Sequence, residues 1–356
     1  LGDRACEVPR KGGDMSTEGG TRAIIAALLA NLGIAVTKFV AYLISGSTSM
    51  LAESVHSLAD SGNQVLLIIG GRRAKKAATP EHPFGFGRER YVFAFLVSII
   101  LFSVGGVFSI YEGVHKIEHP EPINVPWLPI TVLIISIGLE SFSLRTALRE
   151  SADQRRGISI LQFVRRAKAP ELPVVVLEDI AALVGLTLAL FGVGVAVITG
   201  NGVWDGIGTV MIGLLLVAVA VLLGIETQSL LVGEGASEED TEAIRDAAVA
   251  GDDVQRIIHM KTLYLGPEEL LVAMKVAVTP TQSAATVAAA INAVEARVRA
   301  AVPSARAMYI EPDIYDPDRA LDRPPAGRPP AADRPAGSPG SAAPAVRACV
   351  AEARSM

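Results

Sequence analysis

The sequence predicts a membrane protein, an all-α six-helix transmembrane bundle followed by a small α+β domain. Half of the 356 residues are hydrophobic and only 19% are charged, fewer than the roughly 25% of an ordinary soluble domain. Six apolar runs reach the roughly 20 residues that a helix needs to cross a bilayer. After Gly233 the composition changes to that of a soluble module. These observations predict the two parts and their order.

The chain starts with a polar, glycine-rich segment, residues 1–20, which we expect to be disordered and to lack a cleavable signal peptide. Met15 is an alternative start within it. The transmembrane domain is predicted at 21–232. Its six spans are predicted at 23–45, 49–71, 91–113, 127–147, 172–198 and 206–231.

Lys and Arg residues predict the orientation of the spans. They accumulate in the segments 72–90 and 145–168, whereas the loops 46–48 and 199–204 have none. Short cytoplasmic loops are enriched in these residues. We therefore expect both termini in the cytoplasm, and a multi-pass protein of a bacterial cytoplasmic (inner) membrane.

Residues 233–317 predict a cytoplasmic domain of order α-β-β-α-β, similar to ferredoxin or a metallochaperone. An acidic helix start follows Ser237, alternating strands flank Gly266-Pro267, and a helix of period 3.6 at 284–301 precedes a last strand at 305–310. Residues 318–356 are rich in Pro and Ala and too poor in large apolar groups to form a core, so we expect a disordered tail.

The second span carries a polar stripe made of Ser49, Glu53, His56, Asp60 and Asn63. Their spacings of four, three, four and three place them on one helix face. His56 and Asp60 lie about one turn apart, so an imidazole and a carboxylate can converge on one ion, a donor set that suits Zn²⁺, Mn²⁺, Fe²⁺ or Co²⁺. The alternative is a hydrogen bond between the two that stabilises helix packing. The cost of ~3 kcal/mol for inserting each charged group favours the metal site.

The fifth span begins with a second acidic point, Glu178-Asp179. Adjacent helix residues point about 100° apart, so one carboxylate can face the second span while the other points elsewhere. The alternative is a pair of interfacial carboxylates near the cytoplasmic end of the helix.

Composition also bears on other classes of function. The net charge of −5 offers no basic surface for nucleic acid, and Cys6 and Cys349 lie in polar ends, which argues against a thiolate site. The chain has no nucleophile motif and no phosphate loop, so we expect neither an enzyme nor a resident cofactor. A scaffold or metal sensor that does not transport, and a cation channel, remain as alternatives to a carrier.

Several segments together resemble the cation diffusion facilitator family of metal exporters. Residues 46–60, which read Gly-Ser-Thr-Ser-Met-Leu-Ala-Glu-Ser-Val-His-Ser-Leu-Ala-Asp, resemble its signature second span, and the loop from His82 to Arg90 resembles the one before its third span. Trp204-Asp205 and the α-β-β-α-β module also match. The Glu178-Asp179 pair looks closest to the subgroup of mitochondrial zinc-transporter-nine-like proteins.

The resemblance implies a tetrahedral metal site built by two residues of the second span and two of the fifth. His56, Asp60 and Asp179 match three of these positions. The fourth is commonly His and is Val175 here, so that Glu178, or else Glu53, Asn63 or water, completes the shell. The family further implies a homodimer through the cytoplasmic domain and exchange of a divalent cation, Zn²⁺ first, for protons by alternating access.

Overall fold

The computed structural model describes residues 15–45, 48–120, 127–155 and 157–317. Within these ranges the side chains of some helical residues, including Glu53 and His56, are outside the description. The predicted disordered segments fall mostly on residues 1–14 and 318–356, which lie outside it as well. The described residues up to Ile314 belong to one compact unit. Its first helix starts at Met15, inside the segment that was predicted to be disordered.

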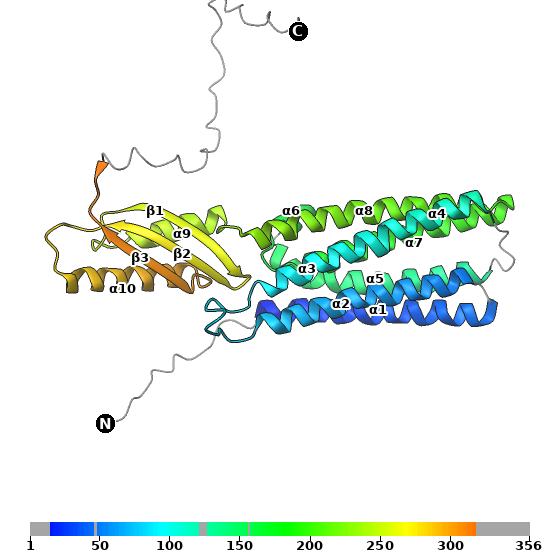
Figure 1. Cartoon of the computed structure of the whole chain (residues 1–356), viewed down its shortest axis with the longest axis horizontal. Coiled ribbons are helices and arrows are strands. Elements are labelled where there is room, and N and C mark those ends of the chain that lie inside the picture. The colour runs from blue at the N-terminus through cyan, green and yellow to red at the C-terminus, as the bar shows by residue number, and fades with distance from the viewer. Residues whose placement is uncertain (1–14, 46–47, 121–126, 156, 318–356) are drawn as a thin grey trace, which may run out of the picture. The chain divides into compact units, whose positions relative to one another are not determined.

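Long helices occupy the predicted spans (Figure 1). They are α1 (Met15–Ser45), α2 (Thr48–Ala74), a continuous helix formed by α3 (Glu89–Ile100), η1 (Leu101–Val107) and α4 (Phe108–Glu118), then α5 (Trp127–Arg155), α7 (Glu171–Thr199) and α8 (Val203–Val232). The middle part of the third helix, η1, has the wider π-helical turn.

Five of these helices are long and apolar enough to cross a membrane, counting only the described part of the chain. The exception is α2, which is 27 residues long. It carries the polar stripe and has Arg72 and Arg73 in its last turn, so its composition is too polar for the same criterion. A multi-pass membrane protein is therefore confirmed, and the prediction of six spans is confirmed for five.

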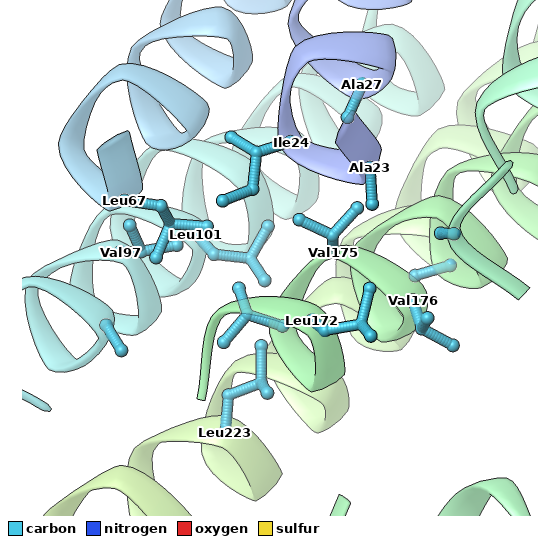
Figure 2. Close-up of a cluster of buried hydrophobic side chains, with 14 of the residues drawn as sticks. Ala23, Ile24, Ala27, Leu67, Val97, Leu101, Leu172, Val175, Val176 and Leu223 are labelled. Atoms are coloured by element: carbon cyan, nitrogen blue, oxygen red, sulfur yellow. The ribbon is translucent and has the colours of Figure 1, made fainter. Parts of the chain in front are cut away.

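The helices pack in a defined order of neighbours. α1 lies against α2 and α5, α7 lies against α5 and α8, and α8 lies against the helix that runs from α3 to α4. A buried apolar cluster joins α1, α2, α3, η1, α7 and α8 at one end of the bundle, with Ile24, Leu67, Val97, Leu172 and Leu223 among its members (Figure 2).

Glycines bring the backbones of α4 and α8 into direct contact. A Cβ added to Gly213 would lie 2.7 Å from the backbone nitrogen of Ile110, and one added to Gly113 would lie 2.6 Å from that of Val210. A Cβ added to Gly206 would lie 2.9 Å from the carbonyl oxygen of Gly113. Such contacts are the means by which small residues hold membrane helices together. We call this contact the glycine seam.

A short helix, α6 (Ile160–Arg166), precedes α7 and was not predicted. Ser159 starts it with a capping box, in which its hydroxyl accepts from the backbone N–H of Gln162 and the Gln162 side chain accepts from the N–H of Ser159. This pairing satisfies backbone donors that a helix start leaves open.

The small domain has the order α9 (Glu238–Val249), β1 (Arg256–Gly266), β2 (Glu269–Ala277), α10 (Ala284–Ala301) and β3 (Ala307–Asp313). The strands lie in the order β1-β2-β3, with β1 antiparallel and β3 parallel to β2. Thr262 pairs with Val272, which pairs with Met308 on the other side.

Alternate residues of β2 form the core of this domain. Leu270, Val272, Met274 and Val276 are buried in one cluster with residues of α9 and α10, whereas the residues between them are only half-buried. The period of two places the first set on one sheet face. Both helices therefore cover the same face, and the predicted small α+β domain is confirmed.

Candidate metal site in the helix bundle

The site is built around two carboxylates near the start of α7. The helix begins at Glu171, and Pro173 is tolerated because the first turn leaves its backbone N–H groups without helical partners. Glu178 and Asp179 follow two turns later and are buried, with 7% and 1% of their surface exposed. Buried acids in an apolar helix are costly unless they are paired or functional.

Glu178 faces α2. Its Oε1 accepts a hydrogen bond from Nδ2 of Asn63 at 2.8 Å, and its Oε2 accepts from Nε2 of Gln64 at 3.1 Å. Gln64 Oε1 in turn accepts from Nδ2 of Asn31 on α1 at 3.4 Å. This chain of buried amides fixes the carboxylate of Glu178 and links three helices. We call it the amide brace.

Asp179 faces α5. Its Oδ2 accepts a hydrogen bond of 2.7 Å from the hydroxyl of Ser143. The carboxyl group of Glu140, which is only 2% exposed, lies beside it on α5 and interacts electrostatically with it. Asp179 therefore has both a hydroxyl donor and a second acidic group as neighbours on α5.

The acidic side chains of three helices influence one another in this region. Asp60 of α2 is half-buried and interacts electrostatically with Glu178 and with Glu140. Beside them, the amide oxygen Oδ1 of Asn63 is buried and has no hydrogen-bond partner within the described part of the chain. An unpaired acceptor among carboxylates is a suitable oxygen ligand for a cation.

The predicted ligand set is only partly visible. His56 belongs to α2, but its side chain lies outside the described residues. The same holds for Glu53. Among the side chains that are described, no three of His, Cys, Asp or Glu are arranged closely enough to hold a metal ion. The structure thus brings Glu178, Asp179 and Asp60 into one region, and the complete ligand set remains a prediction.

Val175, at the position where an imidazole was expected, lies in the apolar cluster. It is fully buried, and Figure 2 shows it among the side chains of Ala23, Ile24 and Leu172. The residue occupies the same helix face as Asp179, one turn earlier. This part of the face packs against hydrocarbon groups, so it supplies no ligand.

The sequence indicated Glu140 as a charge inside an apolar span that should face the bundle interior, but it did not place this residue beside Asp179. Ser143, one turn later, and the amides Asn31 and Gln64 inside two other spans were missed. The burial of Glu178 and Asp179 against α2 and α5 favours an interior site over the alternative of interfacial carboxylates.

The fold and the site define the chain as a multi-pass membrane protein whose helices enclose acidic and amide side chains, with a small α+β domain after them. Residues 24–232 match the cation efflux transmembrane domain. The chain belongs to the cation efflux family, that of the cation diffusion facilitators, which confirms the resemblance found in the sequence.

The relatives agree with the expected subgroup. The chain is 30% identical over 255 residues to the mitochondrial proton-coupled zinc antiporter SLC30A9 of Xenopus laevis, an alignment that covers 71% of this chain and 46% of the relative. It is 29% identical to metal tolerance protein C4 of Arabidopsis thaliana, over 69% of this chain and 54% of the relative. It is 25% identical to the cation-efflux pump FieF of Cronobacter sakazakii, over 70% of this chain and 79% of the relative. The chain thus spans about half the length of the first two relatives.

Proposed function

We propose that this chain carries a divalent transition metal, Zn²⁺ in the first place and Mn²⁺, Fe²⁺ or Co²⁺ as further candidates, across a membrane in exchange for protons by alternating access. His56, Asp60, Asp179 and Glu178 are the proposed ligands. The family membership and the zinc antiporters among the relatives support this assignment.

The observation that carries the proposal is the buried acidic pair of α7. Glu178 and Asp179 point to two different helices, and each is held by hydrogen bonds from side chains of that helix. A structural role alone would not need two adjacent ionisable groups, because the neutral amides and hydroxyls around them could pair with one another. Ionisable groups inside a membrane helix normally mark an ion pathway.

Exchange for protons follows from the chemistry of the donors. Carboxylates and imidazole bind a metal only in their deprotonated forms, so metal binding releases protons and protonation releases metal. Glu140 lies beside Asp179, one of the proposed ligands, and interacts electrostatically with it. A dication bound at Asp179 would favour the deprotonated forms of both carboxyl groups.

The second candidate function is that of a scaffold or metal sensor that does not transport. The amide brace favours it, because hydrogen bonds between buried amides and a carboxylate are typical of helix packing.

Metal uptake into proteoliposomes with an imposed pH difference distinguishes the two functions. We expect His56→Ala and Asp60→Ala to abolish Zn²⁺ flux while the protein still folds. His259→Ala and Asp252→Ala are the matched controls, because both side chains are exposed in the small domain, and their flux should equal that of the wild type. Wild-type protein that folds and binds Zn²⁺ but shows no flux under any gradient would leave the sensor as the function.

The remaining assignments are part of the same proposal. We place both termini in the cytoplasm because Lys and Arg gather in the loops on that side. A homodimer through the small domain, and residence in a bacterial cytoplasmic membrane, are also proposed. The relatives named above include one mitochondrial protein.

A further inference from the structure

A cavity lies at the end of the bundle where α2 ends and α7 begins. Its volume is about 290 Å³. Its floor is apolar and includes Ile24, Leu67 and Leu172, all members of the buried cluster in Figure 2. It is also lined by Gly71. Neither Glu178 nor Asp179 lines it, so it is separate from the candidate metal site.

The charged groups of the cavity are mainly positive. Arg72, Lys75 and Arg90 line it, against the single carboxylate of Glu171. Arg90 is 9% exposed, and its Nε lies 3.2 Å from Oε1 of Glu171, so these two charges neutralise each other. Arg72 and Lys75 are exposed, and neither side chain has an ion-pair partner among the residues that the structure describes. Two positive charges therefore remain for a ligand, and they would repel a metal ion.

The cavity adjoins an exposed apolar surface of α1. Ile25 lines it and is 44% exposed. Leu29, Leu32 and Val36 continue the same exposed apolar surface along α1. A molecule in the cavity would therefore touch hydrocarbon on one side and two cations on the other. Basic pockets between transmembrane helices at a membrane surface suit anionic lipid headgroups.

We propose that this cavity binds an anionic phospholipid, with its phosphate at Arg72 and Lys75 and the first part of an acyl chain along Ile24, Ile25 and Leu67. A soluble anion would use the two cations but not the apolar floor. A zwitterionic lipid would use the floor, but its own positive group would face Arg72 and Lys75.

The test measures lipid binding to the purified full chain in detergent by native mass spectrometry, with phosphatidylglycerol and phosphatidylcholine as probes. The wild type should bind phosphatidylglycerol more tightly. The double variant Arg72→Gln/Lys75→Gln should weaken this binding by about tenfold or more, since each cation near an anionic headgroup contributes measurably to affinity. Both side chains are exposed, so the variant should fold normally.

A second variant separates the cavity from general electrostatic attraction. A Cβ on Gly71 would meet Glu171 Oε1 at 3.9 Å, an ordinary contact, so Gly71→Leu can fill the space while every charge stays. It should also weaken phosphatidylglycerol binding. The matched control Arg145→Gln/Arg149→Gln removes two exposed cations of α5 that do not line the cavity, and it should bind within about twofold of the wild type.

Three results would overturn the proposal. The control could lose as much affinity as Arg72→Gln/Lys75→Gln, which would mean general attraction. A folded Gly71→Leu variant could bind normally, which would place the lipid elsewhere. Inorganic phosphate without lipid could raise the melting temperature of the wild type as much as phosphatidylglycerol does, which would make the ligand a soluble anion.

Discussion

The amide brace gives a quantitative prediction, because Glu178 accepts one hydrogen bond from each of two buried amides. The contact of Asn63 Nδ2 with Glu178 Oε1 is 2.8 Å long and buried. Hydrogen bonds between helices of membrane proteins contribute about 0.6 kcal/mol on average and up to about 1.7 kcal/mol. In a double-mutant cycle of Asn63→Ala and Glu178→Leu, we therefore expect a coupling energy of about 0.6–1.7 kcal/mol between the two side chains.

The cycle is measured by reversible unfolding in mixed micelles, with circular dichroism as the signal. Glu178→Gln keeps an acceptor oxygen of similar size and should be less destabilising than Glu178→Leu. Asn63→Ala with Thr187→Ala is the control cycle, because the hydroxyl of Thr187 bonds to its own helix at Leu183, and its coupling should stay within about 0.5 kcal/mol of zero. An equally small coupling between Asn63 and Glu178 would refute the brace.

Three further predictions concern packing and the small domain. Gly213→Leu should abolish the monodisperse peak in gel filtration, because a Cβ at this position has no space at the glycine seam. Gly194→Leu is the control and should be tolerated, because nothing lies within 4 Å of a Cβ at that position. Equal behaviour of the two variants would contradict the close contact of α4 and α8. The guanidinium of Arg297 lowers the pKa of Asp253 in the folded protein. The wild type should therefore be more stable than Asp253→Asn at neutral pH, and this difference should disappear as the pH falls below about 3.9, the pKa of an unperturbed Asp, and through the lower pKa of the folded state. A difference in stability that persists in strong acid would exclude this ion pair as its source. Leu270→Ala should destabilise the small domain by about 2–5 kcal/mol in denaturant unfolding, while a comparable loss for Tyr309→Ala, which is 60% exposed, would contradict the described core.

The helical bundle and the small domain could be predicted from the sequence because their periodicities are strong. Apolar runs placed the ends of most spans within a few residues, and the alternation around Gly266-Pro267 indicated the two strands there. The π-helical turn of η1 was not predicted, because its wider hydrogen-bonding pattern leaves no regular sequence signal. The short helix α6 was missed because one capping box is a weak signal inside an Arg-rich loop.

The candidate site could be predicted for α2 and α7 only. The acids of α7 were visible as charges in an apolar run. That Asp179 meets Glu140 and Ser143 depends on which face of α5 turns toward α7, and this is decided by packing among several helices rather than by either sequence alone. Val175 was recognised as a departure from the family pattern, and its burial among alkyl groups gives the physical reason why it is not a ligand position.

The glycine seam also restricts how the bundle can rearrange. Where main chains touch, as at Gly213 and Ile110, no flexible side chains lie between the helices to absorb a shift by changing rotamer. α4 and α8 should therefore move together as one rigid body. A crosslink between these two helices should then leave any transport cycle intact, while one between α2 and α7, whose contact consists of side-chain hydrogen bonds, should stop it.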